Sequence, residues 1–404
     1  MVRRNGSIPV IAIAGSRGKS TVVRALDAIF RASGLRTATW TDSGIEIQGR
    51  RQRGELAPWS RAMARLTDGS LDVAIQELDW AMVHAVGLPK KVYPVAAITN
   101  ICVNNDACLI QDEAKRALSA LPSLLSAVHD DGLLVLNGED YAVSGEEIRF
   151  DAPAILAGQS KETPLLRSHL RSGGCAIWVN GEGIAIGTLE ASETVFDQRA
   201  LAYTLNGEAA FQTLNIMVAA AIARGCGIST RQIGDALKSY EPNPMLSPGS
   251  FNVINLGGAT AIVERPDPSW FLRPALRAVR DLPRNRLITV AGKMDEIDVA
   301  DLTEVGRLLG RTSSVLVLHS GREQPERTAL VRQGIALNDF PPVIVHTTTE
   351  RRAVGRVLEM IRPGDAALVL ADNALSVIRA LLKSEGSVED ELVPGPDAIA
   401  AFTT

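Results

Sequence analysis

The stretch Gly15-Ser16-Arg17-Gly18-Lys19-Ser20-Thr21 decides the fold of this chain. It follows a short apolar run, residues 8–14, of the kind that forms a buried parallel strand. It leads into residues 20–33, whose apolar side chains recur at helical spacing. A glycine turn between a strand and a helix points backbone N–H groups and the helix N-terminus at an anion. We therefore predict that these residues form the phosphate-binding loop of a nucleotide site.

The spacing within this loop narrows the class of site. Residue 13 is Ile, so the loop reads G-x-x-G-K-S/T in place of the longer G-x-x-x-x-G-K-S/T. In such a loop Lys19 reaches the β- and γ-phosphates, and the Ser20 hydroxyl holds Mg²⁺. An ordinary strand-to-helix turn with a surface lysine is the alternative interpretation. The short spacing and the lack of an N-K-x-D base-reading motif disfavour a P-loop kinase or a GTPase.

Length and composition are those of a folded protein with two or three domains. The chain has 404 residues, and a domain takes about 150. Its 42 Lys and Arg against 46 Asp and Glu give a net charge of −4, so we expect neither nucleic acid nor a membrane surface as a partner. No apolar run approaches the ~18 residues of a membrane helix. We therefore expect a cytoplasmic protein.

The four cysteines lie at positions 102, 108, 175 and 226 and match no C-x-x-C pattern. They are too few for a disulfide scaffold, and no Cys/His set near Cys102 and Cys108 completes a zinc site. We expect all of them to be buried, reduced thiols.

Strand-like and helical patterns alternate along the first part of the chain. Strands are predicted at residues 72–76, 95–100 and 133–137, and a helix at 211–224. Asn180-Gly181 between two apolar runs predicts a β-hairpin. Alternation of this kind predicts an α/β fold with a mostly parallel sheet that is covered on both faces.

A segment rich in proline, residues 241–250, is the best linker candidate. A second alternating block follows it, with helices at 299–309 and 351–361 and with strands at 251–256, 260–264, 287–291, 314–318, 343–346 and 366–371. We predict a P-loop parallel-sheet ATPase domain over residues 1–245 and a smaller Rossmann-like α/β domain over 246–404.

Several motifs together resemble the Mur ligase superfamily, and in particular the C-terminal, Mur-ligase-like half of cyanophycin synthetase. The loop is similar to T-G-T-N-G-K-T/S-T of that superfamily, and R-G-K-S-T also resembles the loop of poly-γ-glutamate synthase. Further similar stretches follow in the same order, from residue 8 to about 384: W-T-D-S-G-I-E-I-Q-G (40–49), L-N-G-E-D (136–140), H-L-R-S-G-G (169–174), S-P-G-S-F-N (247–252) and R-P-G-D with A-D (362–365 and 371–372).

The resemblance implies a ligase that uses ATP and Mg²⁺. In that superfamily ATP converts a carboxylate to an acyl phosphate, and an amine then displaces the phosphate to form an amide. Lys19 and Ser20 match the phosphate and Mg²⁺ residues, and Glu77 matches the glutamate that binds Mg²⁺. Lys19 and Glu77 are thus the expected catalytic residues, and Ser20 and Glu77 the metal ligands. Asn215 matches an asparagine that contacts adenine, although a surface position on an Ala-rich helix is the alternative.

The chain also departs from the family pattern. Asn104 and Asn105 stand where Asp and His are expected, and Asp106 lies one residue further on. Asn is a poorer ligand than a carboxylate for a hard cation. The lysine that many members carbamylate falls near Leu121, six residues beyond Lys115. Three more differences concern Trp80, Ser250 and Glu264: an Arg-Gly run after Glu77 is replaced by Trp80-Ala-Met-Val, Ser250 replaces an arginine, and the stretch after Glu264 lacks a histidine.

Two classes of function remain. The first is an ATP-dependent carboxylate–amine ligase that adds an amino acid to a peptide or polymer end. The second is a nucleotide-binding subunit that has lost ligase chemistry and acts through a partner. Because the phosphate loop begins at residue 15, we expect no preceding substrate domain. The sites for the small carboxylate and amine would then come from loops, a partner chain or a homo-oligomer.

Overall fold

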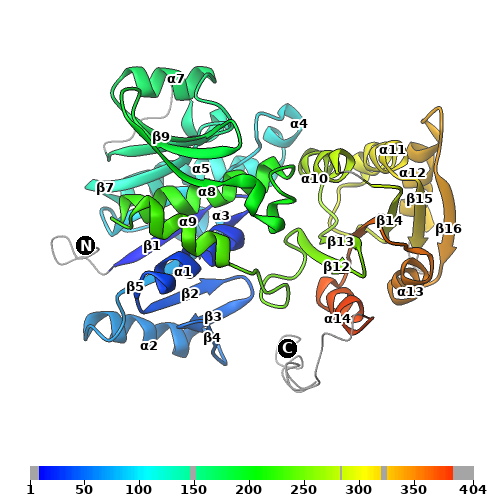
Figure 1. Ribbon diagram of the computed structural model, residues 1–404, viewed down its shortest axis with the longest axis horizontal. Helices are drawn as coiled ribbons and strands as arrows, with labels where there is room; N and C mark the ends of the chain where they lie inside the picture. The colour runs from blue at the N-terminus through cyan, green and yellow to red at the C-terminus, as the bar shows by residue number, and fades with distance from the viewer. Residues whose placement is uncertain (1–8, 146–151, 283, 320–324, 385–404) are drawn as a thin grey trace. The chain divides into compact units, whose positions relative to one another are not determined.

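The computed structural model describes residues 9–145, 152–282, 284–319 and 325–384 (Figure 1). Ile8, at the start of the first predicted strand, lies outside these ranges. The chain divides into two compact units, Met1–Pro242 and Asn243–Thr404. The boundary between them falls within the proline-rich segment 241–250.

The first unit is built on one 11-stranded sheet with the strand order β11-β10-β9-β8-β7-β6-β1-β5-β2-β3-β4. The strands from β9 to β2 in this order pair in parallel, and both ends of the sheet are extended by antiparallel pairs. The strands are β1 Val10–Ala14, β2 Thr37–Thr41, β3 Gly44–Ile47, β4 Arg50–Arg51, β5 Val73–Leu78, β6 Tyr93–Ile98, β7 Val128–Asn137, β8 Ala154–Gly158, β9 Cys175–Asn180, β10 Gly183–Gly187 and β11 Ser192–Asp197.

Helices cover this sheet. The α-helices of the first unit are α1 Lys19–Ala32, α2 Leu56–Thr67, α3 Trp80–Val86, α4 Asp106–Leu109, α5 Asp112–Ala127, α6 Tyr141–Ser144, α7 Pro164–Arg171, α8 Ala210–Gly225 and α9 Thr230–Ser239. Short 3-10 turns, η1 Gln198–Ala200 and η2 Ala202–Thr204, precede α8. Helices α1, α8 and α9 pack together (Figure 1), and α3 packs on α5.

The core of the first unit explains why β1 and α1 form where they do. Every residue of β1 is buried, as expected for a central strand with neighbours on both sides. Val22, Val23, Leu26 and Ile29 of α1 pack in the same apolar cluster. Helix α8 completes the cluster with an unbroken buried run from Asn215 to Ala223. The strand and helix that flank the glycine loop are therefore both fixed by burial of apolar side chains.

The second unit is a 6-stranded sheet with the order β12-β13-β17-β14-β15-β16, parallel except for the β12–β13 pair. Its strands are β12 Asn252–Leu256, β13 Ala259–Glu264, β14 Leu287–Ala291, β15 Val315–His319, β16 Val343–Thr347 and β17 Ala366–Leu370. Its helices are α10 Ser269–Asp281, η3 Val299–Asp301, α11 Leu302–Thr312, α12 Pro325–Ala336, α13 Glu350–Met360 and α14 Ala374–Ser384.

The predicted α/β class is confirmed, and so are the predicted strands and helices to within a few residues at their ends. The hairpin at Asn180-Gly181 is present as β9 and β10. The sequence analysis did not predict β2, β3, β4, β8 or β11. None of the described helices is long and apolar enough to span a bilayer.

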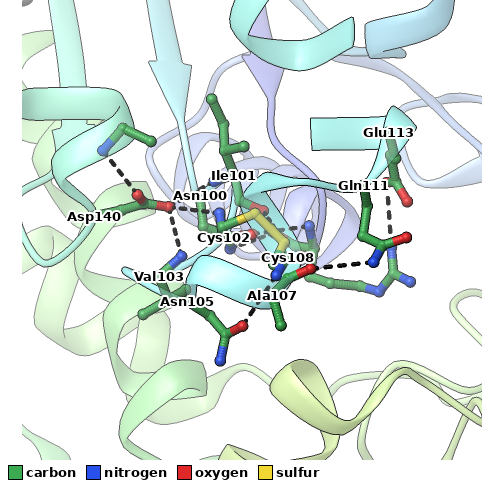
Figure 2. The surroundings of a disulfide bond; sticks show 12 residues. Asn100, Ile101, Cys102, Val103, Asn105, Ala107, Cys108, Gln111, Glu113 and Asp140 are labelled. Carbon is green, nitrogen blue, oxygen red and sulfur yellow. Dashed lines mark hydrogen bonds and ion pairs between the residues drawn. A yellow bond between two sulfur atoms is a disulfide. The ribbon is translucent and has the colours of Figure 1, made fainter. Parts of the chain in front are cut away.

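The expectation that all cysteines are reduced is wrong for one pair. Cys102 and Cys108 form a disulfide across six residues of sequence, with a Cα–Cα distance of 5.6 Å (Figure 2). The loop after β6 turns back through α4, and this turn brings the two side chains together. Cys175 and Cys226 are free thiols, as predicted, and Cys226 is buried, but Cys175 is only half-buried.

Candidate nucleotide site

The glycine loop lies at the carboxyl end of β1, directly before the first turn of α1. Gly15 and Gly18 have φ angles of 144° and 85°. A Cβ on Gly15 would lie 1.9 Å from the Thr99 hydroxyl oxygen, so this position has no room for a side chain. The loop is thus held against the end of the neighbouring strand β6.

Asn100 holds the loop through hydrogen bonds to the main chain of Ser16 and Arg17. The Asn100 side-chain oxygen accepts from the Arg17 N–H at 3.2 Å, and its amide nitrogen donates to the Arg17 carbonyl at 2.9 Å. The Ser16 N–H donates to the Asn100 carbonyl at 2.9 Å, and the Thr99 hydroxyl donates to the Arg17 carbonyl at 2.6 Å. These four bonds fix the backbone before α1 begins.

Asp140 in turn holds the segment that follows Asn100. It is fully buried, and one carboxylate oxygen accepts the N–H groups of Ile101, Cys102 and Val103 at 2.7–3.0 Å (Figure 2). Its other oxygen caps α6 by accepting from the Ala142 N–H. The Cys102–Cys108 disulfide lies beside this carboxylate (Figure 2). Asp140 belongs to the L-N-G-E-D stretch, and its role here is to order the loop that supports Asn100.

The first turn of α1 is open to an anion. It has no acidic residue, and Gly18 at its N-cap supplies no side-chain cap. Its first N–H groups have no partner within the helix, since these donors have none in any α-helix. The Lys19 ammonium donates to the Gly15 carbonyl at 2.9 Å and so lies over the loop. Arg17, Lys19, Ser20 and Thr21 are all partly exposed, so a ligand has access to them.

Glu77 lies near the end of β5, the strand next to β1. Its Oε2 accepts from the Asp42 N–H at 3.0 Å, and its Oε1 is buried without a hydrogen-bond partner among the described residues. Burial and the nearby Asp42 carboxylate raise the pKa of Glu77 to about 7, while Ser20 and Lys19 lower it. Lys19, Ser20 and Glu77, which the sequence analysis predicted to share one site, therefore lie near one another.

Asn215 is buried, so the alternative of a surface position is wrong. Its side chain lies against the loop, because a Cβ on Gly18 would be 2.3 Å from its Oδ1. Its amide nitrogen donates to Gln212 on the same helix at 3.2 Å. Helix α8 thus presents an asparagine to the loop.

At the positions that depart from the family pattern, the two asparagines hydrogen-bond to main-chain groups. Asn104 donates to the Glu139 carbonyl and accepts from the Tyr141 N–H. Asn105 caps α4 by accepting from the Cys108 N–H (Figure 2). Asp106 is exposed at the start of that helix. Leu121 is a buried residue of α5, and Lys115 lies 3.6 Å from Asp112.

Two of the motifs that carry the resemblance are structural. In the segment 247–252 the Asn252 side chain accepts from the Gly249 N–H at 2.7 Å and donates to the Ser247 carbonyl at 3.0 Å, which folds S-P-G-S-F-N into a turn. His169 bonds main-chain carbonyl oxygens, and Gly174 leaves room for its ring.

Two further positions differ from the family pattern. Trp80 is buried at the start of α3, and one Glu264 oxygen accepts from the Arg265 N–H.

The sequence did not indicate that Thr99, Asn100 and Asp140 support the loop, or that the Asp42 N–H donates to Glu77. Asp42 and Asp140 lie within the similar stretches 40–49 and 136–140, whereas the signal for Thr99 and Asn100 was their position. Thr99 and Asn100 directly follow a predicted strand, and the carboxyl ends of parallel strands meet at one edge of a sheet.

No family model matches the chain. The cyanophycin synthetase of Trichormus variabilis is 22% identical over 396 residues, which cover 96% of this chain and 44% of that protein. The UDP-N-acetylmuramoyl-L-alanyl-D-glutamate–2,6-diaminopimelate ligase of Geobacillus kaustophilus is 22% identical over 372 residues, 89% of this chain and 73% of that protein. The chain thus spans less than half the length of the cyanophycin synthetases that it matches.

Solved structures show the same fold. Escherichia coli FolC in complex with ADP superimposes with a TM-score of 0.64 at 15% identity, over 95% of this chain and 91% of that one. The MurF ligase of Thermotoga maritima in complex with ADP gives a TM-score of 0.61 at 14% identity, over 94% and 80%. In sequence and in fold, the chain is thus similar to ligases of the Mur ligase superfamily. Within that class it resembles cyanophycin synthetase.

Proposed function

We propose that this protein is an ATP-dependent carboxylate–amine ligase that works through an acyl phosphate. The observation that carries the proposal is the juxtaposition of an uncapped α1 N-terminus, the Lys19 ammonium and the buried, unpaired Oε1 of Glu77. The relatives named above are a synthetase and ligases, and two structural neighbours hold ADP, which supports the same class of reaction.

The loop would bind the phosphates of ATP. The N–H groups of the first turn of α1 supply donors, and the helix dipole adds partial positive charge. Lys19 would exchange its bond to the Gly15 carbonyl for a bond to a phosphate oxygen. Asn215, which lies against Gly18, is placed on the side of the loop where α8 passes.

The residues present also fit Mg²⁺. A hard cation takes oxygen ligands, and the Ser20 hydroxyl and the unpaired Glu77 Oε1 offer them. Bound Mg²⁺ would neutralise charge on the β- and γ-phosphates during transfer. Loss of the Glu77 proton to solvent would accompany binding, because burial favours the neutral acid in the free protein.

The proposed chemistry has two steps. A carboxylate oxygen of the acceptor attacks the γ-phosphorus of ATP, the bond to the leaving ADP oxygen breaks, and an acyl phosphate forms. The amine nitrogen then attacks the acyl carbon, the carbon–oxygen bond to phosphate breaks, and the amine loses a proton to solvent. The protein contributes position and charge stabilisation. The acceptor we propose is an amino acid or the end of an acidic peptide.

A second candidate is a nucleotide-binding subunit without ligase chemistry of its own. It is favoured by Asn104 and Asn105, whose side chains are committed to main-chain partners, and by the buried Leu121. These positions supply no charged ligand for a second cation. The loop and Glu77 alone would still bind one Mg²⁺–ATP.

The test is release of ADP and phosphate from ATP with panels of carboxylates and amines, followed by mass spectrometry of the amide. Lys19→Ala serves as the blank, and Lys161→Ala, at an exposed lysine of the same unit, as the matched control. We expect amide formation by wild type and Lys161→Ala, and none by Lys19→Ala. If wild type binds ATP but matches the blank with every pair of substrates, the binding subunit replaces the ligase.

A further inference from the structure

The second unit carries a polar cluster at the carboxyl ends of its central strands. His319 is the last residue of β15, Asp372 follows β17, and Glu350 begins α13. Strands β14 and β17 are parallel neighbours, but the chain leaves them towards opposite edges of the sheet. After β14 it continues to β15, whereas α14, which follows β17, packs on β12 and β13. Open α/β sheets bind ligands at such a switch point, beyond the carboxyl ends of the strands.

The three side chains converge on one point. One ligand atom from each lies within 4.8 Å of the other two, and His319 Nδ1 is 4.0 Å from Asp372 Oδ2. Two metal bonds of about 2.1 Å at a tetrahedral angle hold their ligand atoms about 3.4 Å apart. A small side-chain rotation would therefore close the set around an ion.

His319 is the observation that separates this cluster from an ordinary group of surface acids. It is 3% exposed, and its Nε2 has no hydrogen-bond partner in the described part of the chain. Buried polar groups are nearly always paired, so an unpaired buried imidazole nitrogen beside two carboxylates indicates a missing ligand. Its other ring nitrogen, Nδ1, faces Asp372 Oδ2 at 4.0 Å.

Neighbouring main-chain groups hold the three side chains in place. A Cβ on Gly292, at the end of β14, would lie 2.0 Å from His319 Cε1 and 2.8 Å from Asp372 Oδ2, so only glycine fits. Asp372 Oδ2 accepts from the Lys293 N–H at 3.4 Å. Glu350 Oε1 accepts from the Asp372 N–H at 2.7 Å, which fixes the Glu350 carboxylate beside the end of β17.

We propose that His319, Glu350 and Asp372 bind a divalent transition-metal ion in the second unit, separate from the Mg²⁺–ATP site of the first. One imidazole nitrogen and two carboxylate oxygens form a donor set typical of Zn²⁺ or Mn²⁺. Three protein ligands leave at least one coordination position for water or a substrate oxygen. The proposal does not depend on the ligase activity.

The experiment is calorimetric titration of the metal-stripped full chain with Zn²⁺, Mn²⁺ and Mg²⁺ in the absence of nucleotide. We expect one Zn²⁺ or Mn²⁺ per chain. His319→Ala and Asp372→Asn should each weaken binding by about tenfold or more, since even outer-shell changes at metal sites have effects of that size. Absorption of the Co²⁺-loaded protein reports the nitrogen ligand independently and should change in His319→Ala.

His346→Ala is the matched control, because His346 lies on the neighbouring strand β16 beside Arg332 and outside the cluster. Glu77→Gln is the control for the first unit. Both should bind Zn²⁺ or Mn²⁺ as wild type does. Melting temperatures without metal establish that the variants are folded, and Asp372→Asn serves if His319→Ala is not. The proposal is overturned if wild type binds neither ion, if Asp372→Asn binds as tightly as wild type, or if Glu77→Gln abolishes binding.

Discussion

The side chain of Asn100 makes two hydrogen bonds with the main chain of Arg17, one in each direction. An amide is the side chain that can donate and accept in this way at once. The bonds join the end of β6 to the phosphate loop, so the shape of the loop is set by a residue more than eighty positions away.

Asn100→Ala should weaken ATP binding without unfolding the protein. It removes the Asn100 partner of the Arg17 N–H and leaves the Arg17 carbonyl with the Thr99 hydroxyl, at a cost of about 1–3 kcal/mol. If the loop conformation that binds ATP is destabilised by this amount, the affinity for ATP drops roughly 5- to 150-fold. Calorimetric titration with ATP and Mg²⁺ measures it. Asn100→Asp should bind still more weakly, because it adds negative charge beside the phosphates; equal or tighter binding by that variant would contradict the proposed location.

Lys19→Ala should remove the rise in melting temperature that ATP produces. At a ligand concentration of 100 Kd, binding stabilises a protein by about 2.7 kcal/mol. Lys19 is partly exposed and donates to the Gly15 carbonyl, so its loss should change the nucleotide-free melting temperature little. Thermal unfolding of wild type, Lys19→Ala and Lys161→Ala with and without ATP makes the comparison. A full ATP shift in Lys19→Ala would place the nucleotide elsewhere.

Glu77→Gln should raise the free energy of unfolding of the metal-free protein above that of wild type at pH 8, and by less at pH 4.5. The folded-state pKa of Glu77 is raised from 4.5 to about 7, chiefly by burial. The wild-type carboxyl therefore favours folding fully below pH 4.5, and this contribution is lost as the pH rises through 7. Because one pKa unit corresponds to about 1.4 kcal/mol, the gain from Gln at pH 8 is at most about 3 kcal/mol.

Urea unfolding in EDTA at several pH values measures this difference. The exposed Glu162 offers the control, since Glu162→Gln should show no such trend. A stability difference between Glu77→Gln and wild type that stays constant from pH 4.5 to 8 would show that Glu77 ionises normally.

Thiol counting distinguishes the disulfide from four reduced cysteines. Cys226 is buried, which raises the pKa of its thiol to about 12, and burial also raises the pKa of Cys175. Both should react slowly with Ellman's reagent in the native protein at pH 7.5, since the thiolate is the reactive form. Unfolding without reductant should release two reactive thiols, and prior reduction should release four. Four thiols without reductant would mean that Cys102 and Cys108 are not joined.

Much of the fold could be predicted because its signals are local. The apolar run before Gly15, the helical spacing after it and the Asn180-Gly181 turn each specify their own element. The placement of Lys19, Ser20 and Glu77 near one another was predicted from the resemblance to the Mur ligase superfamily, and it agrees with the rule that ligands bind beyond the carboxyl ends of parallel strands.

The residues that could not be predicted act over long sequence distances. Asn100 supports Arg17, and Glu139 binds Asn104, through contacts that exist only after the strands have assembled. The disulfide depends on the turn at α4, which no periodic pattern marks. Strands β2 and β3 alternate in polarity, as T-A-T-W-T and G-I-E-I, but they are only five and four residues long. Glu46 of β3 is buried and paired to Arg24 at 2.7 Å, a long-range contact that no local pattern marks.

Asp140 has a consequence for genetics. Its carboxylate lies on the turn after β7 and orders residues 101–103. Those residues directly follow Asn100, and Asn100 holds the phosphate loop. In a library of random substitutions, inactive alleles should therefore map to residue 140 as sharply as to the loop itself. Second-site suppressors of such alleles should arise in the segment after β6, because the two stretches form one support and can diverge only together.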